Sequence, residues 1–310
     1  MKVLVLGSNG LVGSSLVRIL SNNKIYDKII GSNRQTLDLF EFDRVKNFIE
    51  DSRPDVIINA AAKVGGILAN NTYRADFILE NLKININLLE ALIPFKDTKL
   101  INLGSSCIYP LNAKNPIKEE YIMTGELEAT NSPYAMAKLT AIELGNSLKS
   151  QYGHKVINLM PTNLYGPNDN FSDKDSHVIP GLMGRMHKTK MQGKEEFEVW
   201  GTGKPRREFL YVDDLANAIT FIIENNIEDE LINIGSNQEI SIKELVNSLI
   251  QVIKFEGKIT FNNNYPDGNP RKLLDSSKIS SYGWKPKVQI DEGLRLTYNW
   301  YLNNLNKSNP

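Results

Sequence analysis

A tyrosine and a lysine lie four residues apart near the middle of this 310-residue chain, at Tyr134 and Lys138. On a helix this spacing places both side chains on one face. A neighbouring ammonium favours the phenolate, so we expect it to lower the pKa of Tyr134 from the usual value of about 10. A phenol tuned in this way could exchange a proton with an alcohol or ketone while a nicotinamide moves the hydride.

Three further side chains could take part in such chemistry: Ser105, Cys107 and His177. Ser105 follows an apolar run, and its hydroxyl could hydrogen-bond a reacting carbonyl. Ser105 and Cys107 are two residues apart in a segment expected to be extended, so we predict that they point the same way. The thiol could then remove a proton from a carbon next to a ketone, although a lone cysteine is more often a small buried side chain. His177 precedes an expected helix start and could cap that helix, lie in a surface loop, or donate a proton opposite Cys107.

Glycines at positions 7, 10 and 13 follow the first apolar run directly. Glycine permits a tight turn and a close approach of the backbone to a pyrophosphate, and the helix that follows offers free N–H groups. This spacing alone is common in strand–turn–helix connections. Its place at residue 7, inside a β-α-β pattern, favours a dinucleotide-binding site.

The end of the second expected strand bears on the choice of cofactor. It reads Gly31-Ser-Asn-Arg34, with no acidic residue directly at the strand end. An acid there favours NAD, whereas a cation favours the 2′-phosphate of NADP. We therefore expect NADP(H), with Arg34 as the phosphate clamp and Asp38 near the adenine; the alternative is that Arg34 is a solvated surface residue.

The elements that position these residues form a regular alternation. We predict strands at residues 2–7, 28–31, 55–60, 99–104 and 155–161, and helices near 11–22, 41–52, 76–93 and 132–152. Near-continuous apolar strands alternating with helices are typical of a parallel sheet covered on both faces. The fold class is therefore α/β, with a Rossmann-type doubly wound sheet whose carboxyl edge binds ligands.

After residue 161 the pattern changes to short strands and turns. We expect strands at 196–200, 207–212 and 231–235, a loop at 265–270, and a helix at 241–255 that Ser241 and Glu244 open with a capping box. A final helix ends the chain. We interpret this as a smaller, interleaved α/β substrate domain of residues 166–209 and 237–310. The cofactor domain would comprise residues 1–165 and about 210–236.

Composition excludes several classes of partner. Lys+Arg and Asp+Glu are both 36, so the net charge is zero and no basic field predicts binding to nucleic acid. No apolar run approaches a membrane span, and the first expected strand leaves no room for a signal peptide. Cys107 is the sole cysteine, which excludes an intrachain disulfide and favours the cytoplasm. We expect no metal site.

Longer motifs are more specific than these fold-level features. They are NAAAKVGG (59–66), ANNTY (69–73), GSSCIYP (104–110), PTNLYGP (161–167), SHVIP (176–180), REFLYVDD (207–214) and PDGNPRKLL (266–274). Together they resemble the extended short-chain dehydrogenase/reductases, and within these the epimerase/reductases of GDP-linked 4-keto-6-deoxy sugars. The resemblance extends from about residue 2 to about residue 303.

The resemblance implies a role for each matching residue. Ser105, Tyr134 and Lys138 match the reductase triad, Cys107 the epimerisation base and His177 the acid. Residues that would hold the GDP-sugar are Arg185, Trp200, Arg207 and Asp267. Residues that would hold NADP(H) are Gly7, Ser8, Asn9, Gly10, Leu11, Val12, Gly13, Arg34, Asp38, Ala61, Lys138, Pro161, Thr162, Asn163, Leu164 and His177. Asn9 departs from relatives that carry Arg in the glycine turn, so the 2′-phosphate argument depends mostly on Arg34.

The implied reaction is epimerisation of GDP-4-keto-6-deoxy-mannose at C3 and C5, followed by NADPH-dependent reduction at C4, which gives GDP-L-fucose. One alternative is an epimerase/reductase or simple C4 reductase of a related GDP-4-keto-deoxy sugar, such as a dideoxy-hexose or 6-deoxy-heptose. A more distant alternative is a non-catalytic NADP-sensing scaffold, against which the intact triad argues.

The expected helix 76–93 also predicts a homodimer. Its apolar stripe is Ile78, Leu82, Ile86, Leu89 and Ile93, with Phe77, Ile84 and Leu88 largely off that stripe. A helix that is apolar on more than one side needs two partners. Neighbours in the same chain could supply both, or paired helices from two subunits could meet in an isologous four-helix contact, as the resembling family assembles.

Overall fold

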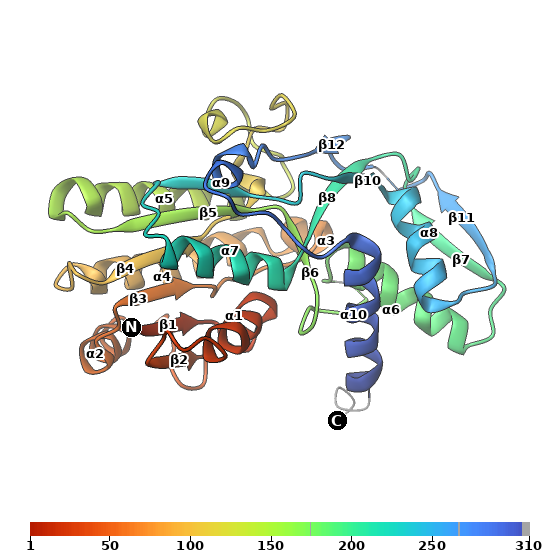
Figure 1. Ribbon diagram of the computed structural model, residues 1–310. Coiled ribbons are helices and arrows are strands. Elements are labelled where there is room, and N and C mark those ends of the chain that lie inside the picture. The colour runs from red at the N-terminus through yellow and green to blue at the C-terminus, as the bar shows by residue number, and fades with distance from the viewer. Residues whose placement is uncertain (174, 266, 306–310) are drawn as a thin grey trace.

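A parallel sheet forms the centre of the computed structural model, which describes residues 1–173, 175–265 and 267–305 (Figure 1). Within these residues the sheet has six strands in the order β2-β1-β3-β4-β5-β9. They are β1 (Lys2–Leu6), β2 (Lys28–Ser32), β3 (Val56–Asn59), β4 (Lys99–Leu103), β5 (Val156–Pro161) and β9 (Leu231–Ile234). The order reverses between β1 and β3, and doubly wound sheets bind ligands in the crevice at such a reversal, at the carboxyl ends of the strands. The predicted Rossmann-type fold is confirmed.

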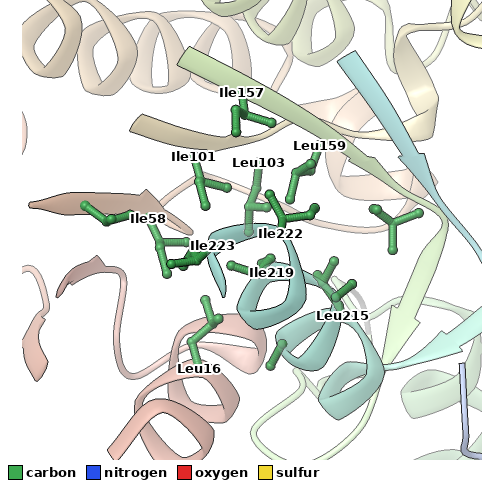
Figure 2. Packing of buried hydrophobic residues seen from close by; sticks show 14 of the residues in the cluster. Leu16, Ile58, Ile101, Leu103, Ile157, Leu159, Leu215, Ile219, Ile222 and Ile223 are labelled. Carbon is green, nitrogen blue, oxygen red and sulfur yellow. The ribbon is translucent and has the colours of Figure 1, made fainter. Parts of the chain in front are cut away.

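Helices cover both faces of this sheet. Helices α1 (Leu11–Ser21) and α7 (Val212–Glu224) pack on one face. Figure 2 shows Leu16, Ile219 and Ile222 from these helices against Ile58, Ile101 and Leu159 of the strands. Helices α2 (Phe42–Ser52), α4 (Arg74–Leu92) and α5 (Ser132–Tyr152) cover the other face. Burial of each such aliphatic side chain contributes about 1.5–3 kcal/mol, which explains why the strands are apolar on both sides.

The remaining strands form two smaller sheets beside the carboxyl edge. In one of them β8 (Arg206–Tyr211) pairs with β10 (Glu239–Ser241), β12 (Arg271–Lys272) and β6 (Asn163–Tyr165). In the other, β7 (Glu196–Trp200) pairs with β11 (Lys258–Asn262). Helices α6 (Val178–Met191), α8 (Ile242–Ile253) and α10 (Ile290–Asn304) pack around a second, aromatic-rich core that includes Tyr165, Phe197 and Tyr298. The division into two domains stays a prediction.

Most predicted elements end within two residues of their observed bounds, and the capping box of Ser241 and Glu244 is confirmed. Several elements were not predicted: α3 (Ile67–Thr72), α7, α9 (Ser277–Ser281), the short strands β6, β10, β11 and β12, and the turns η1 (Ser106–Ile108) and η2 (Glu119–Tyr121). The strand expected at 207–212 ends at Tyr211, because Val212 already begins α7. Position 266 of the expected loop lies outside the described residues.

A row of buried asparagines crosses three neighbouring strands of the large sheet. Asn59, Asn102 and Asn158 are partners in register on β3, β4 and β5. The amide of Asn59 donates to Asn102 at 3.2 Å, and the amide of Asn102 donates to Asn158 at 3.1 Å. Asn85 on α4 and the carbonyl of Glu230 extend the row at its two ends. Every amide in the row has a partner, which avoids the cost of about 1–3 kcal/mol for a buried unpaired polar group.

Two sequence expectations concern membranes and metals. No helix in the described part of the chain combines the length and apolar character needed to cross a membrane. Among the same residues, no group of three or more His, Cys, Asp or Glu side chains could hold a metal ion.

Candidate active site

The glycine turn lies in the crevice where the strand order reverses. Gly7 has a φ of +77°, which favours glycine, and a Cβ there would lie 3.0 Å from the backbone of Ala60 and Ala61. A Cβ on Gly13 would lie only 2.1 Å from the carbonyl oxygen of Gly7. These two positions therefore admit no larger residue, and Ala61 borders the same crevice.

The amino end of α1 opens onto this turn. Gly10 is its N-cap, and within the described residues no side chain caps the helix. The first-turn N–H groups, which begin at Leu11 and Val12, thus remain available to an anion together with the positive end of the helix dipole. Ser8 donates its backbone N–H to Ser32 of β2 at 2.8 Å, which fixes the turn, while Asn9 is exposed. The cradle fits a pyrophosphate.

Arg34 and Asp38 lie just beyond the carboxyl end of β2. Arg34 is exposed, its guanidinium carbon lies 4.9 Å from the centroid of the Phe40 ring, and within the described residues it forms no ion pair. Asp38 accepts the backbone N–H of Phe40 at 3.0 Å. This loop therefore presents a free guanidinium beside the same edge of the sheet, where a 2′-phosphate could meet it.

Residues 161–164 connect the large sheet to the smaller one. Pro161 ends β5, and Thr162 donates its backbone N–H to Ile234 of β9 at 3.0 Å. The side chains of Thr162 and Asn163 both donate to the carbonyl of Glu208, at 3.2 and 2.8 Å. Leu164 continues into β6, beside β8. This segment holds the predicted nicotinamide side of the site in one fixed conformation.

The predicted triad lies where α5 crosses the end of β4. Lys138 is 3% exposed and donates to the carbonyl of Leu103 at 2.8 Å, with Nζ 5.8 Å from the centroid of the Tyr134 ring. Burial lowers the pKa of Lys138 to about 8. For Tyr134, burial raises the pKa above its usual range and the Ser105 hydroxyl partly opposes this shift. The expected lowering of the Tyr134 pKa was therefore wrong, because desolvation of the buried phenol is the largest cause of the shift and disfavours the phenolate. A tyrosine that keeps its proton suits a proton donor.

The segment after β4 turns instead of continuing as a strand. Ser105 is extended, with φ −160° and ψ 148°, but its hydroxyl accepts the backbone N–H of Cys107 at 3.2 Å and Ser106–Ile108 form a turn of 3₁₀ helix. The extended segment expected around Ser105 and Cys107 was therefore wrong. Cys107 still lies at the site, since it interacts electrostatically with both Tyr134 and Arg207 and its sulfur is 3.7 Å from Lys272 Nζ.

His177 is the N-cap residue of α6, but its side chain forms no capping hydrogen bond. The ring is 45% exposed, and Nδ1 lies 3.9 Å from a carboxylate oxygen of buried Asp169. Two residues before His177, the backbone carbonyl of Asp175 accepts the N–H of Gly66 at 3.1 Å. The adjacent Gly65 lies against the ring of Phe77, and that ring contacts the Tyr134 ring edge-on. The segment just before His177 is thus linked to Tyr134 through Gly66, Gly65 and Phe77. No contact joins His177 to Cys107 in the described structure, so their pairing stays a prediction.

The four predicted GDP-sugar residues form two groups. In the first, the guanidinium carbon of Arg185 lies 4.6 Å from the centroid of the Trp200 ring, and Tyr265 stacks on that ring at 4.9 Å and 20°. Trp200 is 46% exposed, so this stack of a cation and two aromatic rings faces solvent. Burial lowers the pKa of Arg185. Such a surface could hold a planar base or the face of a sugar.

The second group surrounds β8. Asp267 accepts the N–H and hydroxyl of Thr202 at 2.9 and 2.6 Å. Arg207 is half-buried, and burial lowers its pKa, while Cys107 and Asp267 oppose that shift. A Cβ on Gly268 would lie 3.1 Å from the Arg207 guanidinium, so the loop that bears Asp267 passes close over Arg207.

Three residues at or next to the site were not predicted from the sequence. Lys272 contacts the Cys107 thiol, Phe77 packs on Tyr134, and Glu208, the neighbour of Arg207 on β8, is fully buried. Glu208 accepts the backbone N–H groups of Asn237 and Leu274, and burial raises its pKa. Lys272 and Glu208 stand within motifs that carried the family resemblance, so their position in those motifs was an available signal. Phe77 gave none, because it resembled any other apolar helix residue.

Comparisons with known proteins agree with this geometry. A family model described as the NAD dependent epimerase/dehydratase family matches residues 3–235. GDP-L-fucose synthase 1 of Arabidopsis thaliana is 48% identical over 304 residues, which cover 98% of this chain and 94% of that protein.

Two solved structures share the fold along almost the whole chain. A GDP-L-fucose synthetase from Naegleria fowleri bound to NADP has a TM-score of 0.89 at 28% identity, covering 98% of this chain and 95% of that one. A GDP-6-OMe-4-keto-L-xylo-heptose reductase from C. jejuni also has a TM-score of 0.89, at 32% identity and 98% coverage of both chains. The predicted family is thereby confirmed: the chain belongs to the NAD dependent epimerase/dehydratase family and is similar along almost its whole length to GDP-L-fucose synthases.

Proposed function

We propose that this enzyme converts GDP-4-keto-6-deoxy-mannose to GDP-L-fucose with NADPH, through epimerisation at C3 and C5 and reduction at C4. The observation that carries the proposal is the grouping of a thiol, a phenol and a hydroxyl, those of Cys107, Tyr134 and Ser105, at the carboxyl edge of the large sheet. A plain reductase needs the phenol and the hydroxyl but has no use for the thiol.

The two cofactor-facing features divide the binding of NADPH between them. The cradle of Gly7, Gly13 and the open end of α1 would hold the pyrophosphate, and Arg34 the 2′-phosphate. When bound there, NADPH supplies the hydride for C4. Arg34→Ala should therefore weaken binding of NADPH, with little effect on NADH.

Epimerisation depends on the C4 ketone, which acidifies the hydrogens at C3 and C5. Cys107, as the thiolate, takes the proton, and the electron pair moves onto the C4 oxygen as an enolate, which Ser105 can hydrogen-bond. His177 returns a proton to the carbon from the opposite face, which inverts the centre. After the second inversion Tyr134 donates its phenol proton to the C4 oxygen as that carbon is reduced. Lys138, fixed by Leu103, keeps a cation beneath the phenolate that forms.

The test combines two measurements on one sample. NADPH oxidation is followed against GDP-4-keto-6-deoxy-mannose, a GDP-4-keto-dideoxy-hexose and a GDP-4-keto-6-deoxy-heptose in D₂O, and the product is identified by NMR. We expect fastest turnover with the mannose derivative and deuterium at both C3 and C5. The likeness to a GDP-heptose reductase makes C4 reduction of a related sugar the second candidate. Turnover without deuterium at either carbon would establish that candidate.

We also infer that two copies associate through α4 and α5. Phe77, Ile84 and Leu88 are buried inward, whereas Leu79 and Ile86 on α4 and Met136 on α5 are 54%, 43% and 45% exposed. An outward apolar patch over two adjacent helices supports an isologous contact. Sedimentation at micromolar concentration should give twice 34.9 kDa, and a monomer throughout would exclude the interface. The free thiol suits a reducing compartment, so we propose the cytoplasm as its location.

A further inference from the structure

A lysine with no carboxylate partner touches the sole thiol of this protein. Lys272 on β12 is half-buried, and its Nζ lies 3.7 Å from Cys107 Sγ. In the described structure it forms no ion pair with any Asp or Glu. A half-buried ammonium gives up part of its hydration, so it needs an anion nearby. The thiol is the group that the fold places within reach.

The register of β8 and β12 places a second cation beside Lys272. Lys272 is the direct partner of Arg207 on the adjacent strand, so two cations stand side by side on one face of the sheet. Like charges directly opposite each other destabilise a strand pair. Asp267 interacts electrostatically with Arg207 and also accepts the backbone N–H of Thr202. Among the described residues it forms no ion pair with Lys272.

The other face of the same strands shows how such a pair is satisfied. Arg271 and Arg206 are also direct partners, and there Glu239 lies between them, 2.8 Å from one guanidinium and 3.1 Å from the other. One anion thus bridges two cations on that face. On the opposite face Cys107 occupies the corresponding place, since it contacts Lys272 and interacts electrostatically with Arg207.

We propose that Lys272 is a positioning residue that holds Cys107 as a thiolate, the form that removes the proton at C3 and C5. This inference rests on the proposed function. When the thiolate takes the proton, the electron pair of the C–H bond passes to the C4 oxygen, Cys107 becomes a neutral thiol, and Lys272 stays an ammonium throughout. Lys272 therefore touches the base and acts through it. Cysteines beside cations are the reactive ones in proteins generally.

Alkylation by iodoacetamide tests this without any substrate, because Cys107 is the sole cysteine in the sequence. Lys272→Met should slow alkylation near neutral pH about 3- to 10-fold. A nearby cation changes a thiolate population by roughly tenfold or more, and the higher intrinsic reactivity of the less stabilised thiolate returns part of that loss. Lys272→Arg should restore most of the rate. Arg271→Met, one residue away and on the other face, should leave it unchanged.

Deuterium incorporation gives the second readout. Lys272→Met should lower exchange at C3 and C5 in step with alkylation, and by more than it lowers the kcat for reduction of a ready-made epimerised ketone by NADPH. Wild-type alkylation in Lys272→Met, with a raised KM for the GDP-sugar, would overturn the inference and assign Lys272 to the diphosphate. A wild-type enzyme that incorporates no deuterium would instead overturn the epimerase half of the proposed function, and alkylation would still report the coupling of Lys272 to Cys107.

Discussion

The two sides of the site are built by different means. On the cofactor side the backbone sets the shape: Gly13 leaves no room for a Cβ against Gly7, and Lys138 is fixed to the carbonyl of Leu103. On the proposed GDP-sugar side, side chains from a helix, a short strand and a loop stack on one another, as Arg185, Trp200 and Tyr265 do. Family members could therefore change sugar by exchanging exposed side chains, whereas the cofactor side tolerates little change in the main chain.

We expect the largest effect from removal of the Tyr134 hydroxyl, on the cofactor side of the site. Tyr134→Phe should lower kcat for reduction by roughly 10²–10⁴, the usual contribution of a placed proton donor, with unchanged affinity for NADPH. Steady-state kinetics and fluorescence titration of the cofactor measure the two quantities. Tyr152→Phe, at the end of the same helix, is the matched control and should behave as wild type. Near-normal turnover of the Tyr134 variant would remove this residue from the mechanism.

A single methyl group tests whether the backbone sets the cofactor cradle. Gly13→Ala would place a Cβ 2.1 Å from the oxygen of Gly7, whereas in Gly10→Ala the same distance is 3.5 Å, an ordinary contact. Overpacking of this kind costs about 1–3 kcal/mol, which corresponds to roughly 5- to 140-fold in cofactor affinity if the turn must move. Calorimetry should show weaker NADPH binding and a lower Tm for Gly13→Ala, with the Tm of Gly10→Ala unchanged. If both variants have the same NADPH affinity and the same Tm, the glycine turn can move to accept a Cβ at position 13.

The buried lysine predicts a pH limit for reduction. Burial lowers the pKa of Lys138 to about 8, so the ammonium predominates below that pH and the neutral amine above it. Burial raises the pKa of Tyr134, so its phenol stays protonated over the same range. If the ammonium is required, kcat/KM for reduction should be flat in the pH interval just below the Lys138 pKa. Above it the value should fall about tenfold per pH unit. A profile that is still flat at about pH 10 would contradict the role of the charge.

The smallest effect should come from the exposed stack. Trp200→Ala should raise the KM for the GDP-sugar about 2- to 10-fold, since such ring contacts contribute about 0.5–1.5 kcal/mol, and should leave kcat and Tm unchanged. Phe197 alternates with Trp200 on the same strand but points inward and is 3% exposed. Phe197→Ala should lower stability by about 3–5 kcal/mol. A fall in Tm for the Trp200 variant would show that the stack also supports the fold.

The sequence predicts the large sheet well because its strands, apart from the edge strand β2, are buried on both faces. β3, for example, reads Val-Ile-Ile-Asn and is buried at every position. The short strands β10 and β12 lack any such pattern, because their pairing with β8 depends on tertiary contacts. Helix α7 is a different case. Its apolar residues at 212, 215, 216, 219, 222 and 223 have helical spacing, so the sequence does indicate this helix. It was not predicted because the strand expected at 207–212 included Val212, the first residue of α7.

At the site, the order of the elements along the chain predicts which residues lie at the carboxyl edge of the sheet. It does not predict the direction in which their pKa values shift. Tyr134 and Lys138 were found by spacing, yet the direction of the Tyr134 pKa follows from burial, which spacing does not reveal. Ser105 and Cys107 were found by position, yet the serine hydroxyl captures the cysteine N–H and bends the chain. Lys272 reaches Cys107 across 165 positions of sequence, a distance at which a single sequence gives no contact signal.

The asparagine row across β3, β4 and β5 has a consequence for assembly of the sheet. Apolar strands that are buried on both faces could pair almost equally well after a slip of one residue, since Val, Ile and Leu exchange places at little cost. A slip that separates Asn59, Asn102 and Asn158 would leave several amides unpaired in the interior, each at about 1–3 kcal/mol. The row therefore acts as an alignment key. It destabilises intermediates in which the strands are paired out of register. It therefore helps to determine which residues lie together at the carboxyl edge of the sheet.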